Sequence, residues 1–99
     1  MSVIVTGKVP GDTEQFRRWI AESKDITERI SADARTKGCL HHVFAVGDGF
    51  VLIVDEWETA EGFQQFFQSN PDIPKAMQDA GAKGEPEFTF AEAIDADRF

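Results

Sequence analysis

The segment Phe50-Val-Leu-Ile-Val-Asp-Glu-Trp57 most constrains the fold, because it has the pattern of a strand that is apolar on both faces. Successive side chains of a strand point to opposite sides of the sheet. The result is two apolar rows, one of Phe50, Leu52 and Val54 and the other of Val51, Ile53 and Trp57, with Asp55 in the second. Such a strand needs cover on both faces. One short chain has helices for only one face, so we expect a second copy of the protein to cover the other and to enclose a pocket between the two sheets.

Length and composition limit the class of protein. The 99 residues make one domain, which we place at residues 1–94 with a polar tail at 95–99. A net charge of -8 argues against nucleic acid and anionic membranes as partners, because both are negatively charged. The single cysteine forms no internal disulfide, and no apolar run reaches the roughly 20 residues of a membrane span. With no signal-peptide pattern at the start, we expect a cytoplasmic, soluble protein.

The first half of the chain predicts a strand followed by one long helix. Residues 3–9 are rich in β-branched side chains and end at Pro10-Gly11. Asp12 and Gln15 then form a capping-box pattern, and helical periodicity continues to Gly38, a typical residue after a helix. Acid–base pairs at four-residue spacing are expected on its exposed face, namely Glu14–Arg18, Asp25–Arg29 and Asp33–Lys37.

The second half predicts a hairpin, a helix and a last strand. Residues 39–46 and 50–57 flank Gly47-Asp48-Gly49, and Asp-Gly between two β-rich runs is a strong hairpin signal. Thr59 caps a second helix, which is broken at residues 70–72 and resumes at 73–80 before a strand at 87–93. The order β-α-β-β-α-β is the ferredoxin-like α+β plan, with a four-stranded antiparallel sheet and the helices on one face. We expect two such sheets to pair face to face in a homodimer.

Several motifs resemble the antibiotic biosynthesis monooxygenase-like (ABM-like) domains of the dimeric α+β barrel type. The similarity lies in Gly38-Cys39-Leu40 and in Val54-Asp-Glu-Trp-Glu-Thr59, and the order of elements agrees over nearly the whole chain. The resemblance implies an oxygenase of phenols or quinols that needs no cofactor, a haem-degrading enzyme, an isomerase-like signal-processing enzyme or a protein with no known activity. Trp57 matches a tryptophan that lines the inter-sheet pocket in such folds. Haem-degrading relatives pair an asparagine on the first strand with a histidine on the second helix. This chain has neither, so haem degradation is not expected.

The hairpin register decides which histidine faces the predicted pocket. His41 and His42 are adjacent on a strand and point to opposite faces, so they cannot bind one metal ion together, and we predict no metal site. A two-residue turn at Asp48-Gly49 places His42 opposite Asp55 and Leu40 opposite Trp57. A three-residue loop would instead place His41 opposite Asp55 and Cys39 opposite Trp57, because a one-residue shift exchanges the two faces.

The two-residue register predicts the candidate site. His42 and Asp55 are the candidate catalytic pair, in which the carboxylate fixes the tautomer of an imidazole that acts as a general base. The candidate substrate-binding residues are Leu40, Phe44, Val51, Ile53 and Trp57. A structural His–Asp pair at the rim of the sheet remains the simpler alternative. The same fold could also serve as a non-catalytic binder of small hydrophobic molecules, or as a structural dimer with a filled interior.

Overall fold

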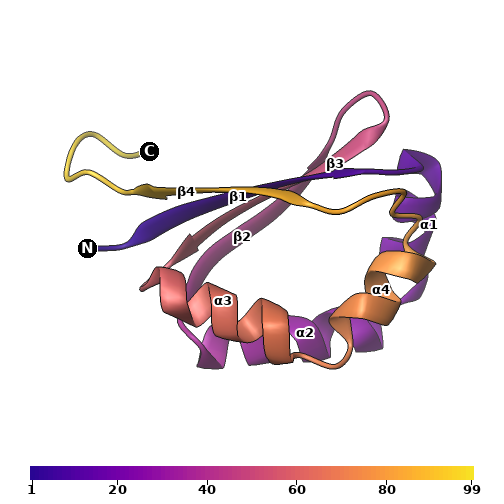
Figure 1. Ribbon diagram of the computed structural model, residues 1–99, viewed down its shortest axis with the longest axis horizontal. Coiled ribbons are helices and arrows are strands. Elements are labelled where there is room, and N and C mark those ends of the chain that lie inside the picture. The colour runs from indigo at the N-terminus through magenta and orange to yellow at the C-terminus, as the bar shows by residue number, and fades with distance from the viewer.

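The computed structural model describes residues 1–99 and contains four strands and four helices. In chain order they are β1 (Val3–Pro10), α1 (Thr13–Glu22), α2 (Lys24–Thr36), β2 (Cys39–Val46), β3 (Phe50–Trp57), α3 (Ala60–Ser69), α4 (Ile73–Asp79) and β4 (Glu87–Glu92). The strands form one antiparallel sheet in the order β2-β3-β1-β4. Helices α2, α3 and α4 lie against one face of this sheet, and α1 lies at one end of it (Figure 1). The ferredoxin-like α+β prediction is confirmed.

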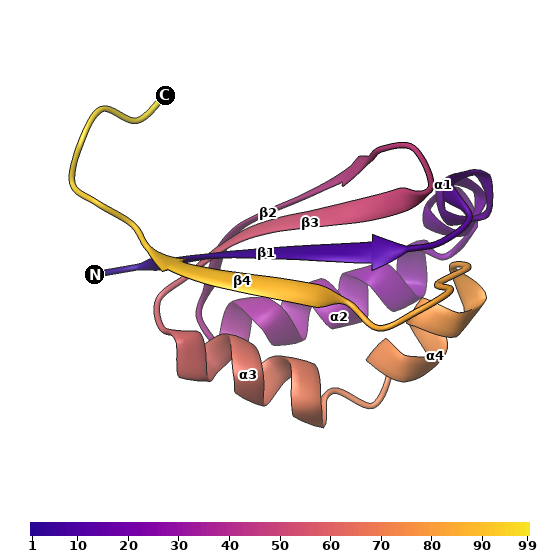
Figure 2. The same ribbon diagram turned by 45° about the horizontal axis from the view of Figure 1, so that its top comes forward.

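The prediction of one continuous helix before Gly38 is wrong, because the chain bends at Ser23 and forms α1 and α2. A straight helix over residues 13–36 would be about 36 Å long at a rise of 1.5 Å per residue. An eight-residue strand spans only about 27 Å, so such a helix would extend past the sheet. The bend lets α2 run beneath the sheet while α1, seen nearly end-on in Figure 2, closes its end.

The two predicted helix caps are present, at the start of α1 and at the start of α3. The Asp12 carboxylate accepts a hydrogen bond from the Gln15 backbone N–H at 3.0 Å, and the Thr59 hydroxyl accepts one from the Gly62 N–H at 3.0 Å. Both bonds satisfy donors that the first turn of a helix leaves free. Of the three predicted acid–base pairs within the helices, only Asp33–Lys37 forms. Arg29 instead pairs with Asp72 at the start of α4, so this ion pair connects α2 to α4.

The row of β3 that contains Trp57 faces the helices of the same chain. Trp57 and Val5 are fully buried, and the ring centroids of Phe63 and Phe66 on α3 lie 5.5 and 5.3 Å from that of Trp57. This corrects the prediction of an inter-sheet pocket next to Trp57. The bulkiest side chains of α3 need an apolar partner, and Trp57 provides the largest one on the sheet. The outward row therefore consists of Phe50, Leu52 and Val54.

The two-residue hairpin turn is confirmed by the pairing of β2 with β3. Val46 lies opposite Val51, Phe44 opposite Ile53 and His42 opposite Asp55. The predicted pairing of Leu40 with Trp57 is wrong. The register shifts between Cys39 and His41, so Cys39 lies opposite Trp57 and Leu40 is the extra residue. A one-residue bulge of this kind follows local backbone geometry and leaves little trace in the hydrophobic pattern.

The N- and C-terminal segments meet on the sheet face away from the helices. Glu56 points to this face and is buried, because the Ser2 hydroxyl donates a hydrogen bond to it and the Arg98 guanidinium pairs with it. The hydrogen bond from Ser2, followed by the one from Arg98, lowers the pKa of Glu56 below its ordinary value. The final residues therefore lie beside this face, as Figure 2 shows, and not beside the helices.

Candidate active site

A cavity of about 490 Å³ lies between the sheet and the helices of a single chain. Pockets of a few hundred Å³ are the usual size for small-molecule ligands. Twenty of its 31 lining residues are hydrophobic, so the space favours a largely apolar ligand. The aromatic members come from α1, β2, β3, α3 and β4, and they are Phe16, Trp19, Phe44, Trp57, Phe63, Phe66, Phe67 and Phe88.

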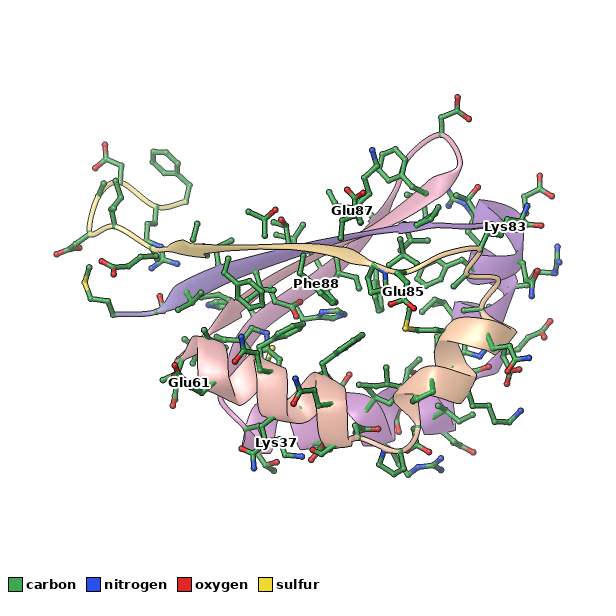
Figure 3. All side chains as sticks on the ribbon, viewed as in Figure 1. Lys37, Glu61, Lys83, Glu85, Glu87 and Phe88 are labelled. Atoms are coloured by element: carbon green, nitrogen blue, oxygen red, sulfur yellow. The ribbon has the colours of Figure 1, made fainter.

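Phe88 shows how the sheet forms one wall of this cavity. Figure 3 shows its side chain directed from β4 toward the helices, while that of the neighbouring Glu87 lies on the other side. The Phe88 ring passes over Gly7 on β1, where an added Cβ atom would come within 2.7 Å of it. The ring then contacts Phe63 and Phe67 edge to face, with centroids 5.0 and 4.9 Å apart. A side chain at position 7 would displace Phe88 from this wall.

The structure brings the predicted catalytic residues His42 and Asp55 together on the cavity side of the sheet. The Nδ1 atom of His42 lies 2.6 Å from Oδ1 of Asp55. The other carboxylate oxygen, Oδ2, accepts a hydrogen bond from Trp57 Nε1 at 3.0 Å. A carboxylate only accepts hydrogen bonds, so Nδ1 carries the proton that the pair shares. The Nε2 atom of His42 is then left with a free lone pair, which is the arrangement of a general base.

The solvent exposure of the side chain differs sharply between Asp55 and His42. The Asp55 side chain is only 5% exposed, whereas that of His42 is 38% exposed. The His42 ring lies edge to face against Phe44, with centroids 4.4 Å apart. Asp55 is therefore held beneath the surface, and His42 is the member that a ligand or solvent can reach.

Trp57 acts in this site mainly through Asp55. It borders the cavity, yet its side chain has no exposed surface, because Phe63 and Phe66 cover it. A ligand in the cavity as it stands would touch those phenylalanines before it touched the indole ring. The indole N–H therefore serves to hold Asp55, a role that the sequence pattern did not indicate.

The remaining predicted binding residues lie along the sheet wall of the cavity. Val51 is buried, Ile53 is partly buried, and Phe44 is 39% exposed and packs edge to face on Phe16 at 5.1 Å. Leu40 also borders the cavity but lies in the bulge and is 46% exposed. It therefore lies at the edge of the cavity and not beneath a ligand.

Cys39 lies beside this site but is a poor nucleophile. Its thiol donates a weak hydrogen bond to the His41 carbonyl oxygen at 3.4 Å. Burial, followed by the nearby charge of Asp55, raises the pKa of Cys39 to about 11. The thiol therefore stays protonated at neutral pH, where only a thiolate would react readily.

Helix α2 supplies cavity residues that the sequence reasoning missed. Thr27, Ser31 and Arg35 follow one another at four-residue spacing and all border the cavity, beside the apolar pair Ile30 and Ala34. Residues four apart lie on the same side of a helix. A polar row next to the apolar row was the available signal in the sequence. No group of three or more His, Cys, Asp or Glu side chains is arranged to hold a metal ion, and no helix is long and apolar enough to cross a membrane.

No model of a sequence family matches the chain, and no curated protein matches it in sequence. Solved structures match it over nearly its full length. The monooxygenase ActVA-Orf6 of Streptomyces coelicolor, solved in complex with nanaomycin D, is 15% identical with a TM-score of 0.70, and the match covers 98% of this chain and 91% of that one.

Two further structures show the same likeness. A candidate antibiotic biosynthesis monooxygenase from Caulobacter crescentus is 12% identical with a TM-score of 0.69, covering 95% of this chain and 91% of its own. Another from Deinococcus radiodurans is 19% identical with a TM-score of 0.62, covering 98% and 97%. At such identities the likeness establishes the fold alone. The chain has the fold of the ABM-like proteins, as its motifs suggested.

Proposed function

We propose that the protein is a cofactor-independent monooxygenase of a small aromatic phenol or quinol, and that the reaction takes place in the cavity between the sheet and the helices. The observation that carries this proposal is the bond between His42 Nδ1 and Asp55 Oδ1 at 2.6 Å, which leaves Nε2 of His42 free at the wall of an aromatic cavity. The fold shared with the Streptomyces coelicolor monooxygenase is consistent with it.

The chain's own residues can perform the proton transfers of such a reaction. His42 takes the phenol proton, and the resulting phenolate is electron-rich enough to react with dioxygen. Two one-electron transfers from the ring to O₂ form a carbon–oxygen bond, and the peroxide anion receives a proton from His42. Loss of the hydrogen on that carbon together with hydroxide breaks the O–O bond. One phenol and one O₂ thus give one quinone and one water, with O₂ as the oxidant.

The test is oxygen uptake with a panel of naphthols and hydroquinones, with quinone formation followed by absorbance. His42→Gln removes the base, so we expect turnover to fall about 10²- to 10⁴-fold. Asp55→Asn should also lower turnover, because an amide no longer fixes the tautomer of His42. The matched control is His41→Gln. His41 also borders the cavity, but it lies opposite Glu56 in the sheet and not opposite Asp55, so its imidazole is not the partner of the Asp55 carboxylate. Turnover in His42→Gln equal to that of the wild type would contradict the proposal.

A non-catalytic binder of small hydrophobic molecules is the second candidate, and the size and apolar lining of the cavity support it. Binding of the same compounds without oxygen uptake would favour this function over catalysis.

We also propose that the protein is a homodimer in which two sheets pair through the face away from the helices. On this face Val43 is 54% exposed, and Val54, opposite it on β3, is only partly covered. An apolar strip that crosses the edge strand β2 and its neighbour β3 is unusual for a surface that stays in water. The pocket does not depend on this pairing, because all of its lining residues belong to one chain.

A further inference from the structure

The cationic side chain at the cavity is Arg35, the single Lys or Arg among the lining residues. It belongs to the last turn of α2 and its side chain is exposed. The structure gives Arg35 no side-chain hydrogen bond and no ion pair, whereas Arg29 and Lys37, which flank it on the same helix segment, are both paired with aspartates. Arg35 is thus a cation without a partner at the border of an apolar space.

The spacing along the chain explains why Arg35 lacks a partner on its own helix. Lys37 pairs with Asp33 four residues earlier and Arg29 pairs with Asp72 of another segment, whereas the residue four before Arg35 is Ser31. Ser31 also borders the cavity, and its hydroxyl makes no hydrogen bond within the chain. Adjacent residues of the polar row on α2 therefore present a free guanidinium and a free hydroxyl on the same side of the helix.

Arg35 lies where the cavity opens to the exterior. The lining residues of α4 and of the centre of the sheet are buried or partly buried, whereas six lining residues are exposed, namely Pro10, Arg35, Leu40, His41, His42 and Phe44. Five of these six come from the end of α2 and from β2, and only Pro10 comes from elsewhere. The opening is therefore between this helix end and the edge strand, with Arg35 on one side and His42 on the other.

The two carboxylates of the lining already have donors of their own. Asp55 accepts from Trp57 and pairs with His42, and Asp12 accepts from the backbone of Gln15. Neither is paired with Arg35. In a chain of net charge -8, the field far from the surface repels anions. A guanidinium at the opening offsets this repulsion locally and offers two parallel N–H donors, a geometry that suits a carboxylate.

We propose that Arg35, with Ser31 beside it, binds the carboxylate of an aromatic acid whose ring system occupies the cavity. The ligand of this pocket is then an aromatic hydroxy acid. Its apolar rings lie among the phenylalanines, and its carboxylate stays at the opening, where solvation is least disturbed. This inference rests on the proposed function only in placing the ligand in the same cavity, since anion binding does not require turnover.

The test is equilibrium binding of a matched pair of compounds under anaerobic conditions. One is a hydroxynaphthoic acid with its two groups at opposite ends of the ring system, and the other is the corresponding neutral amide. The dissociation constants are measured by calorimetry near neutral pH. We expect the wild type to bind the acid about tenfold more tightly than the amide, which corresponds to about 1.4 kcal/mol. Arg35→Gln should remove this preference and leave the affinity for the amide unchanged within about twofold.

Two further variants separate this role from others. Arg35→Lys keeps a point charge without the planar fork, so it should retain part of the preference for the acid. Arg17→Gln removes the same charge from an exposed position on α1 away from the cavity, so it should leave the preference intact. A wild type that binds the acid no more tightly than the amide would overturn the proposal. The proposal would also be overturned if Arg35→Gln weakened the binding of the acid and of the amide equally. Loss of the preference for the acid in Arg17→Gln would overturn it as well.

The outcome is independent of catalysis. Absence of oxygen uptake with every phenol would refute the monooxygenase while leaving a measured preference for the acid intact. Loss of that preference would refute the role of Arg35 while leaving turnover of neutral phenols intact.

Discussion

At the residue scale, Asp55 shows how a charged group can be kept within an apolar row. Its side chain is almost fully buried, and the environment supplies a donor for each oxygen, His42 on one side and Trp57 on the other. Burying a carboxylate without such partners is costly. Trp57 thus holds the Asp55 carboxylate in place, and the carboxylate in turn orients the imidazole of His42.

Trp57→Phe tests this arrangement. The substitution keeps an aromatic ring but removes the N–H donor, so one oxygen of a buried carboxylate loses its partner. We expect the free energy of unfolding to fall by about 1–3 kcal/mol, measured by urea denaturation. The control is Trp19→Phe, because the indole of Trp19 is partly buried but makes no hydrogen bond. A loss no greater than that of the control would show that the bond to Asp55 contributes little.

At the scale of elements, α2 is tied to the segment between α3 and α4 through a small polar network. Asp33 accepts hydrogen bonds from Lys37 Nζ at 2.7 Å and from the buried side-chain amide of Asn70 at 2.8 Å. The side-chain amide oxygen of Asn70, Oδ1, accepts in turn from the backbone N–H of Asp72 at 2.9 Å. The break at residues 70–72 is therefore fixed in place by α2, which holds α4 over the end of the cavity.

Acid should weaken this junction. The hydrogen bond from Lys37, followed by that from Asn70, lowers the pKa of Asp33 below its ordinary value. A carboxyl group with a lowered pKa in the folded state stabilises the fold above its unfolded pKa of about 3.9, and this stability is lost as the pH falls toward the folded value. We expect Asp33→Asn to lower the free energy of unfolding by about 1 kcal/mol at pH 7, a modest effect because the pair is partly exposed. At pH 3 the same substitution should have little effect.

The measurement is thermal or urea unfolding of the wild type and Asp33→Asn between pH 7 and pH 3. Asp25→Asn serves as the control, because Asp25 lies on the same helix, is exposed, and makes no hydrogen bond or ion pair. If the difference in stability between the wild type and Asp33→Asn stayed constant from pH 7 to pH 3, the network would not depend on the charge of Asp33.

At the scale of the whole molecule, the sheet separates two surfaces with different roles. One face, with the helices, encloses the cavity, and the other carries an apolar strip together with the segment around Glu56, Ser2 and Arg98. Figure 1 shows the helices on one side and the C-terminal segment on the other. A dimer through the second face would leave the opening beside β2 and α2 on the opposite side of the sheet.

Val43→Lys tests the proposed pairing of the sheets. Val43 is more than half exposed in the single chain, so a lysine there should leave the fold intact while adding a like charge from each subunit to the proposed interface. We expect the dimer dissociation constant, measured by sedimentation equilibrium, to rise at least about tenfold. Gln64→Lys adds the same charge on an exposed position of α3 and should have no effect. A wild type that is monomeric at tens of micromolar would refute the dimer.

The sequence alone indicated the order of elements and the caps at Asp12 and Thr59, and it favoured the hairpin register that places His42 opposite Asp55, because each depends on residues close together in the chain. Only the tertiary structure decided which face of β3 the helices cover, since both rows of that strand are apolar and local periodicity cannot distinguish them. The bend at Ser23, the bulge at Leu40 and the position of Arg35 at the cavity opening follow from how the helices fit the length and edge of the sheet. Such fitting depends on contacts between distant segments, and no local pattern encodes it.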